Sequence, residues 1–203
     1  MIKGFVVGLV FANGFEWLAH KYILHGTHRA GQARYSPVPK SMQSHWAHHR
    51  EVRTQHFHDV GYVEGIKNWR TRNEIMSLSV VAGIACALFY PWSKGMAAAA
   101  LYSAANYYYI HRRAHLAPDW AKVHIPWHYD HHMNSNQDAN WCVTKPWFDY
   151  LLGTRVISSR DLQEQNPLGV TLPKSWSAWL SRQTAQYFPA QLAEPRAVVE
   201  SHD

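Results

Sequence analysis

Cysteine is scarce in this chain of 203 residues, which contains only Cys86 and Cys142. Two cysteines cannot build a framework of several disulfides or hold an iron–sulfur cluster. The glycine-rich motifs GxGxxG and GxxxxGKS/T, which bind dinucleotides and nucleoside triphosphates, are also missing. Any redox chemistry would therefore draw its electrons from a separate donor, such as a reductase, a ferredoxin or a cytochrome b5-like protein.

Acidic residues are outnumbered, 14 against 20 Lys and Arg, so the net charge is +6. A basic chain can bind nucleic acid, but these charges do not form a binding arm. The mean hydropathy of −0.36 argues against a chain made only of membrane spans. It suits a few membrane helices that carry a large polar cap.

Three apolar runs predict membrane helices: residues 2–19, 75–90 and 96–110. As helices, the second and third would reach only about 24 and 22 Å, so they form a hairpin that either crosses the bilayer or dips into it. A buried hairpin in a soluble bundle is the alternative, but Trp69, Trp92 and Tyr107 near the ends favour a membrane. The first run has Lys3 near its start, as in a signal peptide, yet no small-residue cleavage site follows, so we expect it to be retained.

The basic residues predict the orientation of these helices. Segments 20–73 and 111–203, which contain most of the histidines, hold 18 of the 20 Lys and Arg residues. Cytoplasmic segments of membrane proteins are enriched in these two residue types. We therefore expect an integral membrane protein, of the bacterial inner membrane or endoplasmic reticulum, with its histidines on the cytoplasmic side. No nucleic acid is needed to explain the charge.

Histidine is abundant, and ten of the 15 histidines form four short clusters. The clusters are His20 with His25, His45 with His48 and His49, His111 with His115, and His128 with His131 and His132. A helix turns about 100° per residue, so side chains three and four apart share one face. His20 and His25 are five apart, about 140° round a helix. They meet at one metal only if the helix is distorted or ends between them; otherwise they bind two different metals.

Imidazole is neutral at physiological pH and is a common metal ligand. Ten imidazoles are too many for one ion and suit two, whereas a single pair would more simply be a surface or core feature. We therefore predict a site for two metal ions with all ten as ligands. Glu16, four residues before His20, could orient a ligand ring. His124, four residues before His128, could do the same or add a ligand.

The fold that these features predict is all-α, with about three apolar membrane segments and a cytosolic helical cap that carries the dimetal site. Residues 1–155 form the membrane domain, and residues 156–203 form a C-terminal tail. Residues 173–183 of this tail place Trp176, Trp179 and Leu180 on one helical face. This helix either lies on the membrane surface or packs against the core.

The order HxxxxH, HxxHH, HxxxH, HxxHH resembles that of the membrane fatty acid hydroxylase and sterol desaturase superfamily. Residues 16–25, EWLAHKYILH, are similar to its first box, and residues 109–115, YIHRRAH, to its third. Residues 143–154, VTKPWFDYLLGT, look like the segment after its last box. The resemblance covers about residues 15–155. Residues 19–26, AHKYILHG, also look like the first box of carotenoid ring hydroxylases.

The resemblance implies two Fe ions as cofactors, O₂ as co-substrate and the ten clustered histidines as ligands. The implied reaction inserts oxygen into a C–H bond of a lipid or fatty acyl chain that enters from the bilayer. Zinc binds nitrogen ligands more tightly than ferrous iron, so purified protein can carry zinc instead. The alternatives are a carotenoid hydroxylase or a lipid desaturase with the same centre, and a non-catalytic metal-binding membrane protein.

Overall fold

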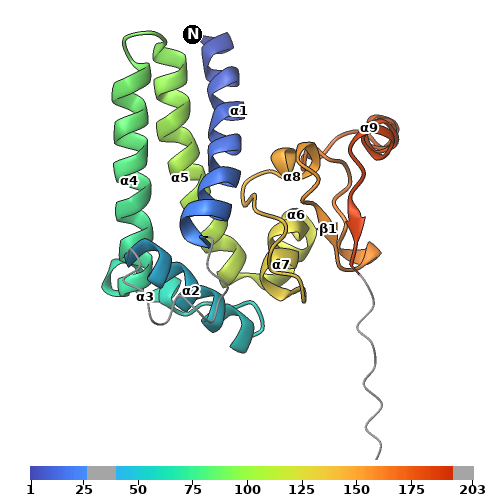
Figure 1. Cartoon of the computed structure of the whole chain (residues 1–203), viewed down its shortest axis with the longest axis horizontal. Helices are drawn as coiled ribbons and strands as arrows, with labels where there is room; N and C mark the ends of the chain where they lie inside the picture. The colour runs from blue at the N-terminus through green and yellow to red at the C-terminus, as the bar shows by residue number, and fades with distance from the viewer. Residues whose placement is uncertain (27–39, 194–203) are drawn as a thin grey trace, which may run out of the picture.

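The structure is a computed structural model that describes residues 1–26 and 40–193. Apart from two short strands, the regular elements in this part of the chain are helical (Figure 1), as predicted for an all-α protein. Most of the loop expected between residues 26 and 44 lies outside the described residues.

Three long helices run side by side in Figure 1: α1 (Ile2–Leu18), α4 (Trp69–Phe89) and α5 (Lys94–Leu116). The Asn68 side chain accepts a hydrogen bond from the Arg70 amide at 3.0 Å and caps the start of α4. The Ser93 hydroxyl caps α5 in the same way, at 3.3 Å from the Met96 amide nitrogen. Each helix of the pair α4–α5 thus begins at a polar cap, and a short turn before Ser93 joins the two helices.

The surface of these helices is strongly apolar. Among the described residues, Ile2–Leu24 and Trp69–Phe89 are long and apolar enough to cross a membrane. Only 11% and 6% of their apolar windows are buried, and Phe11, Val80 and Leu88 are more than half exposed. A core helix of a soluble protein would turn such side chains inward. Two of the three predicted apolar runs therefore lie in helices that can span a bilayer, whereas crossing by α5 stays a prediction.

Helix α5 lies against both α1 and α4, and its contact with α1 depends on a small residue. A Cβ atom at Gly8 would lie 2.6 Å from the Cβ of Ala99 and 3.1 Å from the Cα of Met96. Only glycine permits so close an approach of the two backbones. This contact holds α1 against α5, and the turn that follows α1 carries the first histidines.

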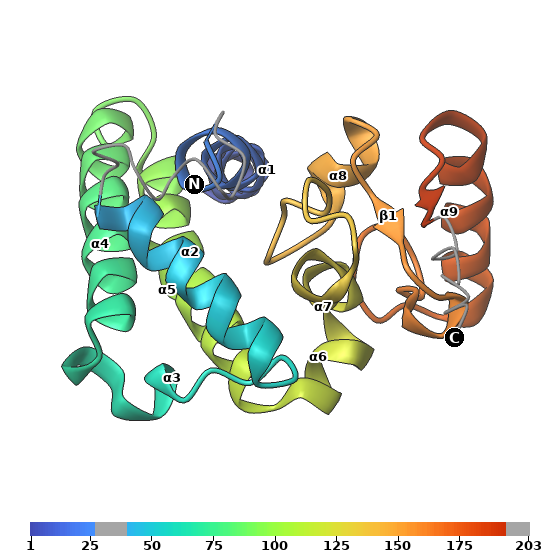
Figure 2. The ribbon, with the colours of Figure 1, turned by 60° about the horizontal axis from the view of Figure 1, so that its bottom comes forward.

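Below the long helices, shorter elements form a cap (Figure 2). They are α2 (Lys40–Thr54), α3 (Gly61–Glu64), the turn η2 (Gly65–Lys67), α6 (Pro118–His124) and α7 (Pro126–Met133). The last two both begin with proline, which suits the first helical position because no amide hydrogen is needed there. A buried cluster joins α2, α5, α6 and α7: Val52, Phe57, Ala114, Ala121, Ile125 and Trp127. This core sets the relative positions of the helices that carry eight of the ten histidines.

The C-terminal part contains α8 (Trp147–Leu151), β1 (Val156–Ile157), η3 (Arg160–Leu162), α9 (Lys174–Tyr187) and β2 (Gln191–Leu192). The two strands pair in parallel, with Val156 opposite Gln191. The fully buried Arg155 guanidinium donates to Glu164 at 2.6 Å and to Asp130 of α7 at 2.9 Å. The predicted division of the chain at residue 155 runs through this ion-pair network.

Helix α9 is seen end-on in Figure 1, so it runs across the direction of the long helices. Its Ser177 faces inward and accepts a hydrogen bond from Asn166 at 3.2 Å. Trp176 and Trp179 are 64% and 52% exposed, so the alternative that this aromatic face packs into the core is wrong.

Candidate metal centre

All ten predicted ligands are buried, none more than 8% exposed. They come from α2, α5, α7 and the turn η1 (Ala19–Leu24) with the residue that follows it, which meet at the lower ends of the long helices (Figure 1). The cap therefore brings four clusters, which are spread over more than 100 residues of the chain, to one place.

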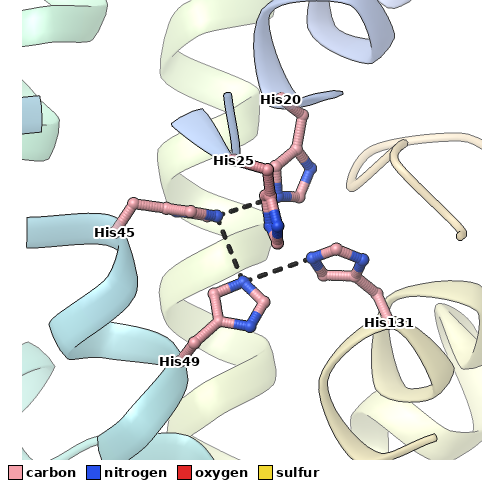
Figure 3. Close-up of side chains that lie close together, drawn as sticks. All are labelled: His20, His25, His45, His49 and His131. Atoms are coloured by element: carbon pink, nitrogen blue, oxygen red, sulfur yellow. Dashed lines mark hydrogen bonds between the residues drawn. The ribbon is translucent and has the colours of Figure 1, made fainter. Parts of the chain in front are cut away.

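Figure 3 shows that five imidazoles face a common centre. This first histidine group consists of His20, His25, His45, His49 and His131. One nitrogen of each lies within 4.8 Å of the others. The Nε2 atom of His45 is 3.1 Å from Nε2 of His20 and 3.1 Å from Nε2 of His49. Nitrogens bound to one metal at about 2.1 Å lie within about 4.2 Å of one another, so small side-chain rotations bring this group onto one ion.

His20 and His25 join the same group because η1 is a π-helical turn. The His25 amide donates to the His20 carbonyl at 3.0 Å, so this hydrogen bond spans five residues instead of four. The wider turn brings residues five apart to one face. The first of the sequence-based options is thus confirmed: the helix is distorted, and the pair faces one centre rather than two.

A second histidine group lies directly beside the first. It consists of His48, His111, His115 and His132, again with nitrogens within 4.8 Å of one another. His128 adjoins it, with its Nε2 atom 3.1 Å from Nε2 of His115. The rings of His49 and His132 have centroids only 4.2 Å apart, so the two groups are in contact. Each HxxHH motif supplies side chains to both groups, as two neighbouring ions would require.

Backbone carbonyls orient three of the rings. Nδ1 of His20 donates to the Trp141 carbonyl at 2.5 Å. The corresponding distances are 2.7 Å from His131 to the Ala139 carbonyl and 2.9 Å from His115 to the Phe57 carbonyl. A carbonyl only accepts, so it holds the proton on Nδ1 and leaves the Nε2 lone pair free for a metal.

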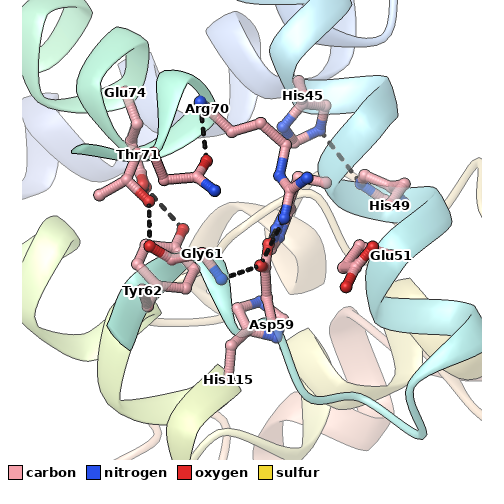
Figure 4. A network of polar contacts seen from close by, with 12 residues as sticks. His45, His49, Glu51, Asp59, Gly61, Tyr62, Arg70, Thr71, Glu74 and His115 are labelled. Atoms are coloured by element: carbon pink, nitrogen blue, oxygen red, sulfur yellow. Dashed lines mark hydrogen bonds and ion pairs between the residues drawn. The ribbon is translucent and has the colours of Figure 1, made fainter. Parts of the chain in front are cut away.

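Carboxylates orient two rings of the second group. Figure 4 shows these carboxylates, Asp59 beside Arg70 and Glu74 beside Tyr62. His48 Nδ1 donates to Asp59 at 2.7 Å, and Asp59 also accepts from Arg70 at 2.7 Å. His111 Nδ1 lies 2.6 Å from Glu74 Oε1, and the Tyr62 hydroxyl donates to the other oxygen of Glu74 at 2.7 Å. A carboxylate behind a ligating imidazole makes that imidazole more basic.

Burial favours the neutral form of several of these imidazoles. It lowers the pKa of His131 to about 4 and that of His25 to about 2. For His132, burial together with neighbouring histidines lowers the pKa well below its usual value. Neutral imidazole is the form that binds metal, so the site presents ligands rather than cations at physiological pH.

Several ring nitrogens in the described part of the chain are buried without a hydrogen-bond partner. They include both nitrogens of His25 and of His132, and Nε2 of His48. A buried polar atom left unpaired costs about 1–3 kcal/mol, so such atoms call for a ligand. Transition-metal ions fit this donor set, since each of these unpaired atoms is a neutral imidazole nitrogen.

Glu16 does not contact His20, contrary to the prediction that it orients a ligand ring. Its carboxylate accepts from the amides of Val143 and Thr144, the latter at 2.8 Å, and from the Thr144 hydroxyl at 2.7 Å. The i, i+4 spacing places both side chains on one side of a helix, but Glu16 turns to the neighbouring chain segment. Its effect on His20 is indirect, because that segment also carries the Trp141 carbonyl.

His124 is not part of the site, so the prediction for it is wrong. Its side chain is exposed, stacks on Trp120 and lies with Nδ1 2.9 Å from the Trp120 carbonyl. The reason is a helix break: α6 ends at His124, and α7 begins at Pro126 on a different axis. Proline disfavours a helical conformation in the residue before it, so the four-residue spacing from His128 does not apply.

Three orienting residues were missed by sequence reasoning: Asp59, Tyr62 and Glu74. The histidine pattern contains no signal for them, because they lie 11 to 49 residues from the rings they contact. A weak hint was available in Glu74, an acidic residue that directly precedes the apolar run of residues 75–90.

No family model, curated protein or solved structure matches this chain. The argument for function therefore depends on the order of the histidine motifs and on the geometry of the two groups.

Proposed function

We propose that the protein is a membrane-bound diiron oxygenase of the fatty acid hydroxylase and sterol desaturase type. It would hydroxylate a C–H bond of a lipid or fatty acyl chain, with O₂ and electrons from a separate donor. The observation that carries this proposal is the convergence of ten buried imidazoles into two adjoining groups at the end of an apolar helix layer. Iron in such a nitrogen site supplies the O₂ chemistry that protein side chains lack.

The surroundings support a substrate from the bilayer. The outward faces of α1 and α4 are apolar, and the histidines begin where α1 ends. A lipid tail held between such helices would have its carbon atoms close to the cap. The basic residues on the histidine side favour its cytoplasmic placement, with α5 as a third crossing.

The perpendicular helix α9 supports the same placement. Its exposed tryptophans lie on a helix that would run parallel to a bilayer crossed by α1 and α4. Tryptophan is enriched at membrane–water interfaces. We therefore propose that α9 lies on the membrane surface.

In this proposal the residues of the chain bind, orient and exclude water. The imidazoles would hold two Fe ions, and backbone carbonyls, Asp59 and Glu74 keep the protons on Nδ1 of five rings, which leaves Nε2 of those rings free for metal. The aromatic rings of Phe57 and Trp141 lie against the histidines and limit access by water. A dry site protects reactive chemistry from side reactions.

The test is expression with iron in a lipid-bearing host, followed by mass spectrometry of lipid extracts. Hydroxylation gives products that gain one oxygen atom, and desaturation gives products that lose two hydrogen atoms. A carotenoid substrate would be identified by supplying carotenoids. His128→Ala, which removes a buried ring next to His115, should abolish the product.

Absence of any new product, combined with zinc restoring fold stability as well as iron does, would favour a non-catalytic metal-binding protein. A transporter would need its site near the bilayer midplane. Residues 75–110 contain no histidine, which disfavours transport.

A further inference from the structure

The two histidine groups differ in the acceptors to which the Nδ1 atoms of their rings donate hydrogen bonds. In the second group, His48 and His111 each donate to a carboxylate, at 2.7 and 2.6 Å. In the first group, the corresponding acceptors are the carbonyls of Trp141 and Ala139. Within the described residues, no carboxylate contacts a ring of the first group.

Carboxylates are present near the first group, but they accept hydrogen bonds from neighbouring backbone amides instead of from the imidazole rings. Asp149 accepts from the amides of Trp141 and Cys142 at 2.8 and 2.9 Å. Glu16 accepts from the next amide, that of Val143. These acids hold the segment that presents the Trp141 carbonyl, and their charge does not reach His20 through a hydrogen bond.

The charges behind the second group also differ from each other. Arg70 pairs with Asp59 at 2.7 Å and offsets its charge. Glu74 accepts hydrogen bonds from His111 Nδ1 and from the Tyr62 hydroxyl, with no Lys or Arg paired to it in the described residues. The negative charge of Glu74 is therefore offset less than that of Asp59, and it raises the basicity of its imidazole more.

We infer that the two ions are held unequally, with the ion of the second group bound more tightly because Glu74 and Asp59 make its imidazoles more basic. Glu74 is a positioning residue: it touches neither metal nor substrate and acts through His111. This inference depends on the dimetal centre of the proposed function, and it adds an order of loading in which the second group fills first.

The test begins with purified full-length protein in detergent, stripped of metal and titrated with Zn²⁺ alone against a chelator of known affinity. Two ions per chain should bind, and their affinities should differ at least tenfold. Glu74→Gln keeps the shape and an acceptor oxygen but removes the charge. It should weaken only the tighter ion, by roughly 10- to 100-fold, because orienting partners typically affect metal affinity to this extent.

A spectroscopic readout separates this effect from a general loss of structure. Protein loaded with ⁵⁷Fe²⁺ should give two Mössbauer doublets, and Glu74→Gln should change one of them. Asp119→Asn is the matched control, because Asp119 is exposed and pairs only with Lys122. It removes one negative charge and should leave both affinities and both doublets unchanged.

Equal affinities in the unchanged protein, or a Glu74→Gln effect on both ions or on neither, would overturn the inference and leave the dimetal centre standing. Failure of the unchanged protein to bind any metal would overturn the proposed function itself. Asp59→Asn offers a second variant if Glu74→Gln does not fold, and it should also weaken only the tighter ion.

Discussion

When an oxygen atom accepts a hydrogen bond from Nδ1 of an imidazole, only Nε2 is left to bind a metal. His20, His115 and His131 have such an acceptor in a backbone carbonyl, and His48 and His111 have one in a carboxylate. Half of the ligand set is therefore fixed in one tautomer before any metal binds. This preorganisation lowers the entropy lost when the metal is bound.

Replacing His48 by alanine removes one ligand of the second group. We expect the metal content to fall by about one ion per chain, because the ion of the second group then has one imidazole fewer to hold it. Elemental analysis of purified protein measures this. His124→Ala is the control and should keep its full metal content, since that side chain is exposed and outside both groups. Near-normal metal content in His48→Ala would contradict the assignment.

Arg155 lies fully buried between Asp130 and Glu164, which are themselves buried. Replacing it by methionine leaves two buried carboxylates without their partner and should lower the free energy of unfolding by about 3–5 kcal/mol. Thermal unfolding in detergent measures the change. Lys122→Met breaks an exposed ion pair and should have little effect. Equal effects of the two changes would show that the buried network does not stabilise α7.

Among the elements, the π-helical turn η1 is the one that makes the first group possible. An ordinary α-helix would place His20 and His25 about 140° apart. The i+5 hydrogen bond removes that separation, in the turn that directly follows the last residue of α1. The arrangement of α1 against α5 thus determines where these two imidazoles point.

Gly8→Val tests this relationship between the elements. The new Cβ would approach Ala99 to 2.6 Å, so α1 must move away from α5, at a cost of about 1–3 kcal/mol. We expect metal content to fall with stability, because η1 moves with α1. Gly83→Ala is the matched control, since a Cβ there has nothing within 4 Å. Unchanged metal content in Gly8→Val would show that η1 is positioned independently of α1.

For the whole molecule, the apolar faces of α1, α4 and α9 must be considered together. Exposed side chains such as Phe11, Leu88 and Trp176 would form an unusually large apolar surface on a soluble protein. A bilayer that surrounded α1 and α4 and reached α9 would cover all three. Such a placement leaves the histidine cap outside the hydrocarbon.

Membrane contact by α9 can be measured with two cysteine variants in a Cys86→Ser background. We expect a spin label on Trp176→Cys to be quenched by lipid-soluble oxygen, and one on Ala178→Cys to be quenched by a water-soluble nickel complex. The two positions lie about 200° apart on the helix. Identical accessibility at both positions would contradict a surface-lying helix.

The sequence by itself identified the ten candidate ligands and the apolar runs, because both depend on local periodicity. The spacing of His128, His131 and His132 requires only that the segment be helical. Tertiary structure alone decided how the ten imidazoles divide into two groups and which oxygen atoms accept hydrogen bonds from them. Asp59, Glu74 and the Trp141 carbonyl reach their rings through contacts between helices distant in sequence. Helical spacing says nothing about such contacts, and so Glu16 was paired with His20 instead of with the segment at Val143.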